Sequence, residues 1–347
     1  MAAGASREAR RQVAAICRVV FQQASRARYP LRLESLSLRR LPSPAATQKI
    51  PHMVSALTYE EVTRGARQFG WRGHDGVPFP GLVWEAADAA SKLHVLCLHG
   101  LSGAAADFGP LARHLSAGGF TVWAINLRGQ GNDPDHRRRG HFLDPREWRA
   151  DLANFTREFF ADTPFDLVGE SMGALVAVDA VANGALDPRR LVLSVPVTET
   201  RAPVPRWAVS LLRQASCLAP RVKLGPMRFV HGKTSIPRLT ADDEYMAYLD
   251  NIPHRVRGFT LDFLTRFHHL MQEAQQSAGR LEVPTLMLSA GRDVFIRPDQ
   301  SRAFFDRIAA PEKEYVFYPD SHHLLWHDVD TDDVLARITR WITEART

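Results

Sequence analysis

The sequence GESMG at residues 169–173 decides the fold class of this chain. Residues 165–168 before it read as a short buried strand, and residues 174–182 after it read as a helix with no breaker before Gly184. A serine in a Gly-x-Ser-x-Gly turn between strand and helix is held in a strained conformation that exposes its hydroxyl. The same pentapeptide also arises by chance or in ordinary tight turns, so the interpretation of Ser171 as a nucleophile depends on the rest of the chain.

Short apolar segments alternate with helical segments along most of the chain. We expect strands at residues 67–72, 81–85, 93–98, 120–126, 165–168, 191–195, 285–289 and 314–318. We expect helices at residues 107–117, 145–160, 174–182, 300–308 and 332–344. The alternation predicts βαβ units, and hence an α/β fold with a doubly wound, mostly parallel sheet. The first two strands are expected to form a hairpin around the turn at residues 73–78.

The alternation lapses once, which suggests a division of the chain into four parts. Prolines punctuate helical patterns from about residue 196 to 280, and we interpret this segment as a helical cap inserted over the strand ends, where open α/β sheets place ligands. Residues 66–195 and 281–347 then form the two parts of the core. Residues 1–65 are an arginine-rich extension and linker, whose pattern suits a transit peptide, a membrane-surface helix or a packed helix equally well.

Composition excludes several classes of function. The chain has 347 residues and a net charge of +6, but its arginines are spread along the sequence, which argues against a nucleic-acid partner. The three cysteines are far apart and no metal-ligand spacing occurs, so we expect neither a metal nor a cofactor. No apolar run is long enough to span a bilayer. Cysteines without pairing signals suit a reducing compartment, so we expect a cytoplasmic protein, with organelle targeting or peripheral membrane binding through the N-terminus as the alternative.

A serine nucleophile needs a base and an acid, and both are expected at strand ends. The hydroxyl must lose its proton to a base that an acid orients. Asp293 follows the strand at residues 285–289, and His322 and His323 follow the strand at residues 314–318. The order Ser, Asp, His is the one expected of this fold. An aspartate in a loop is more commonly a capping or turn residue, which is the alternative for Asp293.

These motifs resemble the α/β-hydrolases, and within them the monoacylglycerol lipase, lysophospholipase and serine aminopeptidase group. The resemblance covers about residues 68–345 and is carried most strongly by residues 99–100, 126–131, 169–173, 290–293 and 321–328. It implies a catalytic histidine followed five residues later by an acid, which favours His323, with Asp328, over His322. Under that reading, His322 only lines the site. The resemblance also implies that the acid comes from the preceding strand, which favours Asp293 over Asp328 and over Asp320, the other rival.

Two backbone N–H groups are expected to stabilise the oxyanion. Met172 follows the nucleophile at the start of a helix, and Leu101 follows His99 and Gly100, where the glycine lets the backbone turn inward. His99 is expected to hold this loop by hydrogen bonding, and His99, Gly100, Glu170 and His322 are expected to line the site. Arg128 is expected to pin neighbouring backbone rather than to bind substrate.

The predicted function is hydrolysis of carboxylic esters of lipid-like substrates, such as monoacylglycerol or lysophospholipid, through an acyl-enzyme. The alternatives are an aminopeptidase or amidase on the same fold, and a non-catalytic binding protein. The expected partner is a small ester or lipid, with transient membrane contact through the cap or N-terminal extension. Two apolar stripes in the cap are expected mainly to pack, with lining of an acyl pocket as the alternative: residues 207, 208, 211, 212, 215 and 218, and residues 259, 263, 264, 267, 270 and 271.

Overall fold

The computed structural model describes residues 56–88, 93–202, 204–224, 237–252 and 254–344. By its internal contacts the chain divides into two units, residues 1–55 and residues 56–347. The expected N-terminal extension therefore lies outside the described residues up to position 55. The fold and the candidate site are built within the second unit.

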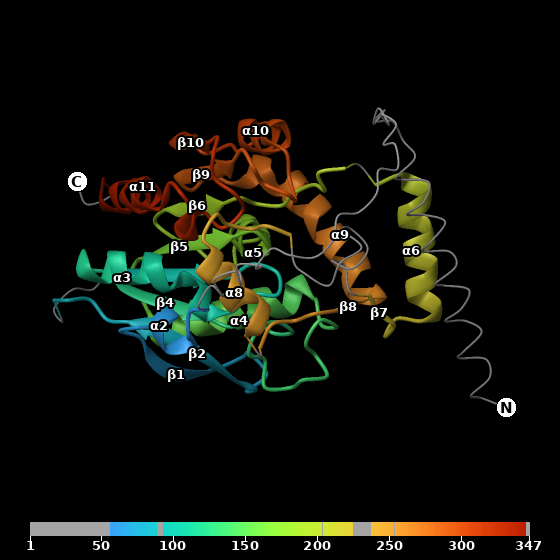
Figure 1. Ribbon diagram of the computed structural model, residues 1–347, viewed down its shortest axis with the longest axis horizontal. Coiled ribbons are helices and arrows are strands. Elements are labelled where there is room, and N and C mark those ends of the chain that lie inside the picture. The colour runs from blue at the N-terminus through green and yellow to red at the C-terminus, as the bar shows by residue number, and fades with distance from the viewer. Residues whose placement is uncertain (1–55, 89–92, 203, 225–236, 253, 345–347) are drawn as a thin grey trace, which may run out of the picture. The chain divides into compact units, whose positions relative to one another are not determined.

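An eight-stranded sheet forms the centre of the described unit (Figure 1). Its strands lie in the order β1-β2-β4-β3-β5-β6-β9-β10, and all neighbouring pairs from β4 to β10 are parallel. β1 and β2 form an antiparallel hairpin, and β2 pairs antiparallel with β4. The strands are β1 (Arg67–Arg72), β2 (Pro78–Trp84), β3 (His94–Leu98), β4 (Thr121–Ile125), β5 (Phe165–Glu170), β6 (Leu191–Ser194), β9 (Thr285–Ala290) and β10 (Lys313–Tyr318). The expected α/β fold with a mostly parallel sheet is confirmed.

Helices cover both faces of the sheet because successive side chains of each central strand point to opposite sides. Leu96 and Leu98 of β3 belong to one apolar core, whereas Val95 and Cys97 belong to the other. The first core is completed by α4 (Pro145–Phe159), α5 (Met172–Ala182) and α10 (Pro298–Asp306). The second is completed by η1 (Ala105–Phe108), α3 (Gly109–Ala117), η3 (Leu325–His327) and α11 (Thr331–Thr343), and by Val62 of the short α2 (Tyr59–Val62).

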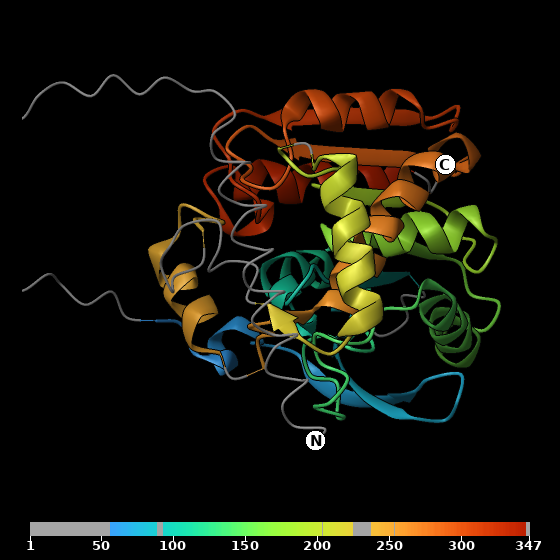
Figure 2. The same ribbon diagram turned by 90° about the vertical axis from the view of Figure 1, so that its right-hand side faces the viewer.

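A mainly helical segment is inserted between β6 and β9. It contains α6 (Arg206–Leu218), β7 (Lys223–Leu224), α8 (Asp243–Asn251), β8 (Phe259–Thr260), α9 (Leu261–Ser277) and η2 (Ala278–Arg280). α9 packs against α5 on one side and against α6 on the other, so α6 lies on the outside of the described unit (Figures 1 and 2). None of the helices among the described residues is both long and apolar enough to cross a membrane.

The two apolar stripes expected in this segment behave differently. Phe259, Phe263, Leu270 and Met271 are buried in the first core, so the second stripe packs as expected. In the first stripe Ala208 is buried, but Trp207 and Leu218 are 49% and 84% exposed. Pure packing is therefore the wrong interpretation for these two residues.

Candidate active site

The turn between β5 and α5 presents Ser171 in a strained conformation. Ser171 has φ 53° and ψ −112°, a region that non-glycine residues rarely adopt. Its N–H donates to the carbonyl of Ser194 at 2.9 Å, which fixes the turn to the end of β6. A Cβ at Gly173 would lie 1.9 Å from the carbonyl oxygen of Leu98, and one at Gly169 would lie 2.6 Å from the Cα of Ala174. Both glycines are required because the backbones approach too closely for any side chain.

His323 and Asp293 meet across the loops that follow β10 and β9. Nδ1 of His323 lies 2.7 Å from Oδ2 of Asp293, and the two side chains are 4% and 0% exposed. Oδ1 of Asp293 accepts the N–H of Phe295 at 2.7 Å, and the Phe295 ring lies edge-on to the imidazole at 4.7 Å. A carboxylate on Nδ1 favours the tautomer with the proton there, which leaves Nε2 as a base. β5, β6, β9 and β10 are parallel neighbours, so their carboxyl ends lie on the same side of the sheet. Ser171, Asp293 and His323 all follow strands at that side.

The neighbouring histidine and the rival carboxylates have other partners. Nδ1 of His322 lies 3.0 Å from Oδ2 of Asp328, and the same carboxylate accepts the backbone N–H of His322. Asp328 therefore contacts His322, although the five-residue interval associates it with His323. Asp320 forms an exposed ion pair with Arg292. Of the three candidate acids, Asp293 is the one that hydrogen-bonds His323.

The loop after β3 passes directly beside Ser171. A Cβ at Gly100 would lie 3.2 Å from the Cβ of Ser171, so this loop could not come as close with a larger residue. His99 is fully buried: its Nδ1 lies 2.9 Å from the carbonyl of Gly100, and its Nε2 accepts the N–H of Leu127 at 3.1 Å. Burial lowers the pKa of His99 to about 4, so the ring is neutral near pH 7. It braces the loop through hydrogen bonds, as expected from the sequence.

The segment that follows β4 also holds this loop. Oδ1 of Asn126 accepts the N–H of Ala105 at 3.1 Å, and Oε1 of Gln130 accepts the N–H of Ser102 at 3.1 Å. Leu101 immediately precedes Ser102, the first of these anchors, and Met172 is the first residue of α5. Neither the Leu101 N–H nor the Met172 N–H donates to another residue in the described part of the chain. Both N–H groups are therefore without a partner among the described residues, as an oxyanion-binding role would require.

Comparison with known proteins agrees with this geometry. The family described as serine aminopeptidase, S33, matches residues 89–330, which is more than half of the chain. The chain belongs to the S33 family of α/β-hydrolases.

Named relatives and a solved structure are similar to most of this chain. A monoacylglycerol lipase of Mycolicibacterium smegmatis is 25% identical over 81% of this chain and 97% of its own length. A phospholipase of Bacillus subtilis is 24% identical over 69% of this chain and 91% of its own. The crystal structure of a soluble variant of Saccharomyces cerevisiae monoglyceride lipase superposes with a TM-score of 0.69 at 18% identity, covering 86% of this chain and 98% of that one. The resemblance inferred from the sequence motifs is confirmed.

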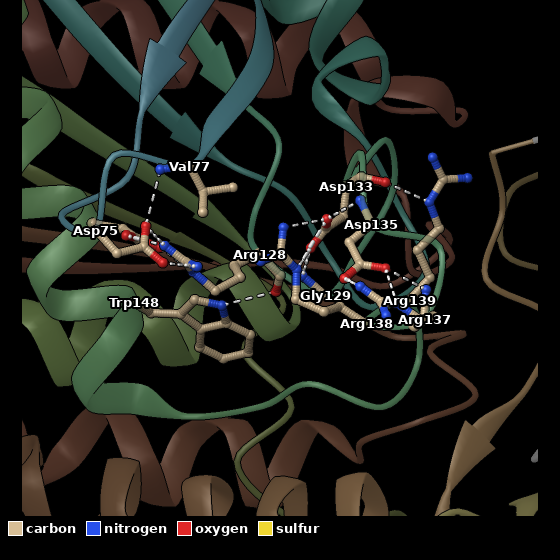
Figure 3. Close-up of polar contacts among 11 residues, drawn as sticks. Asp75, Val77, Arg128, Gly129, Asp133, Asp135, Arg137, Arg138, Arg139 and Trp148 are labelled. Atoms are coloured by element: carbon tan, nitrogen blue, oxygen red, sulfur yellow. Dashed lines mark hydrogen bonds and ion pairs between the residues drawn. The ribbon is translucent and has the colours of Figure 1, made fainter.

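In this S33 chain, Arg128 binds carboxylates rather than the backbone that we expected it to pin. Its guanidinium donates to Asp75 and Asp151, with four nitrogen–oxygen distances of 2.8 Å. Figure 3 shows its contact with Asp75, and also the Arg128 carbonyl, which accepts the indole N–H of Trp148. Within the described ranges, His74, Asp75 and Asp151 form the one group with metal-ligand atoms within 4.8 Å of one another. Arg128 already neutralises both carboxylates, so the group serves as an ion-pair cluster that fixes the segment after β4.

Two buried carboxyl groups, Glu170 and Asp107, have raised pKa values. Glu170 was expected to line the site, whereas Asp107 was not singled out from the sequence. A Cβ at Gly100 would lie 3.7 Å from Oε2 of Glu170, and burial, with a contribution from nearby Asp107, raises the Glu170 pKa well above its ordinary value. Asp107 accepts the N–H of Ala104 at 2.9 Å and the hydroxyl of Tyr245 at 3.3 Å, and burial raises its pKa to about 6. Burial therefore favours the uncharged form of Glu170, the residue that precedes the nucleophile. Its place in the elbow motif was visible in the sequence, but its burial was not.

Proposed function

We propose that this protein is a serine hydrolase that cleaves carboxylic esters of lipid-like substrates, such as monoacylglycerol or lysophospholipid. Ser171 is the nucleophile, His323 the general base and Asp293 the acid that orients the base. The observation that carries the proposal is the 2.7 Å contact between Nδ1 of His323 and Asp293, on loops at the same sheet edge as the strained Ser171.

In the proposed reaction, Ser171 and His323 donate or accept a proton in turn. Nε2 of His323 takes the hydroxyl proton as Oγ of Ser171 forms a bond to the ester carbonyl carbon. The carbonyl oxygen becomes an oxyanion that accepts the N–H groups of Leu101 and Met172, and one such donor is worth about 3 kcal/mol in the transition state. The intermediate collapses, the bond to the alcohol breaks, and His323 returns the proton to the leaving oxygen. Water then attacks the acyl-enzyme with the same base and frees Ser171.

Esters are favoured over peptides by the state of Glu170. An aminopeptidase must also bind the α-ammonium group of its substrate, for which an anion near the nucleophile is the usual device. The carboxyl group next to Ser171 in the chain is buried, and burial raises its pKa, which disfavours the anion that such a substrate would need. The names of the two relatives above, a monoacylglycerol lipase and a phospholipase, support the same substrate class.

The test compares substrates and a nucleophile variant. The wild-type protein should hydrolyse p-nitrophenyl acyl esters and react with a fluorophosphonate probe, and Ser171→Ala should lose both activities. Monoacylglycerols and lysophospholipids should be turned over faster than aminoacyl anilides. Ester turnover by Ser171→Ala, with the protein free of contaminating hydrolase, would refute the assignment, and a preference for anilides would replace it with an aminopeptidase.

A further inference from the structure

The outer face of α6 combines exposed apolar and basic side chains. Seven residues of this helix are exposed, and they recur at helical spacing along one side: Arg206, Trp207, Ser210, Arg213, Gln214, Cys217 and Leu218. The opposite side packs against α9 and contains the buried Ala208 and Ser216 (Figure 2). The outer face is therefore a continuous strip that the described part of the chain does not cover.

Exposed apolar side chains concentrate at this helix. Five large hydrophobic residues are exposed among the described residues, and three of them, Val204, Trp207 and Leu218, lie in or just before α6. Trp207 and Leu218 are 11 positions apart, close to three helical turns, so they point to the same side about 16 Å apart. A tryptophan and a leucine displayed in this way are typical of helices that lie in a membrane interface.

The charge of the same region is uniformly positive. No Asp or Glu occurs between Glu199 and Asp242, whereas that interval holds eight Arg and Lys residues. The interval thus accounts for more than the whole net charge of +6. The basic residues of the strip, Arg206 and Arg213, and those just after it, Arg221 and Lys223, are all exposed.

Some exposed arginines elsewhere on the described surface pair with carboxylates, whereas others, such as Arg146 and Arg340, do not. Arg292 pairs with Asp320, and Arg302 pairs with Asp306. By contrast, Arg206, Arg213 and Arg221 have no carboxylate partner in the described ranges. These arginines can therefore interact with an external anionic surface. The attraction would bring the face that carries Trp207 and Leu218 against that surface.

We propose that the outer face of α6, together with Arg221 and Lys223, binds the surface of a bilayer that contains anionic lipid. The helix lies parallel to the membrane plane, with Trp207 and Leu218 among the head groups and acyl-chain ends and the cations at the phosphates. α9 lies between α6 and α5, so the sheet stays outside the bilayer. This surface acts independently of the chemistry proposed at Ser171.

The test is co-sedimentation of the full chain with lipid vesicles. Binding should be strong to vesicles of phosphatidylcholine mixed with phosphatidylglycerol, weak to phosphatidylcholine alone, and reduced by salt. Each cation near an anionic surface contributes about fivefold in affinity, so Arg206→Gln with Arg213→Gln should bind about 25-fold more weakly. Trp207→Ser with Leu218→Ser should also weaken binding.

Matched controls separate this surface from general charge and from catalysis. Arg146→Gln with Arg340→Gln removes two exposed arginines on α4 and α11, and Phe317→Ser removes an exposed aromatic residue on β10; all should bind as the wild type does. Ser171→Ala should bind normally, so failure of the catalytic proposal leaves this one standing. The proposal is overturned if the α6 variants bind like the wild type, if both vesicle types bind equally, or if the α6 changes instead alter the oligomeric state without lipid.

Discussion

Replacing Asp107 with asparagine should change how the stability of the protein depends on pH. Asp107 is 6% exposed, and burial raises its pKa from 3.8 to about 6. Asparagine has nearly the same shape, and its oxygen can still accept the N–H of Ala104. It cannot ionise. The difference in unfolding free energy between wild type and variant therefore isolates the titration of this one side chain.

The size and sign of the effect follow from the two pKa values. A shift from 3.8 to about 6 corresponds to about 3 kcal/mol. Between these values the folded protein keeps a proton that the unfolded chain has released, so the contribution of Asp107 is fully present below pH 3.8 and is lost as the pH rises through 6. The variant lacks this loss. Its stability relative to the wild type should therefore rise by up to about 3 kcal/mol from acid to neutral pH.

Urea unfolding followed by tryptophan fluorescence, at a series of pH values across this window, measures the difference. Asp320→Asn makes the same chemical change at an exposed carboxylate that pairs with Arg292, and it is the matched control for the substitution itself. Parallel stability curves for wild type and Asp107→Asn would refute the reasoning, because they would mean that Asp107 has the same pKa in the folded and unfolded states.

Two further substitutions test the candidate site and its support. Asp293→Asn should lower kcat/KM for a p-nitrophenyl ester by about 10⁴ with the fold retained, because an amide on Nδ1 of His323 fixes the wrong tautomer; a wild-type rate would contradict the role of Asp293. Arg128→Met should lower the free energy of unfolding by about 3–5 kcal/mol, because it leaves Asp151, which is 3% exposed, and Asp75 without their cation. An unchanged urea midpoint would show that the cluster contributes no stability.

Local sequence pattern was enough to predict the core of the fold. Short, mostly apolar runs, as at residues 93–98 and 285–289, predict buried parallel strands because each must be covered on both faces. The elbow at Ser171 could be found because its glycines are imposed by neighbouring backbone, as the 1.9 Å clearance at Gly173 demonstrates. Asp293 and the histidine pair could be proposed because each comes directly after such a strand.

Contacts between distant segments could not be predicted in the same way. Tyr245 reaches Asp107 across 138 residues, and nothing in either local pattern indicates that contact. The interval between His323 and Asp328 suggested an association, but the chain direction after β10 brings Asp328 to His322 instead. In the same way, helical spacing groups Trp207 with Ala208, and only the packing of α9 decides which of the two faces inward.

The tight fit of Gly173 against Leu98 has a consequence for how this enzyme can diversify. The start of α5 and the strand beside it leave no room for a methyl group, so the elbow has almost no freedom to accept mutations. The segment between β6 and β9 touches the site loops through replaceable contacts, such as the hydroxyl of Ser102 on the carbonyl of Val256. Substrate preference should therefore change during evolution through substitutions in that insertion, while the residues of the nucleophile elbow stay unchanged.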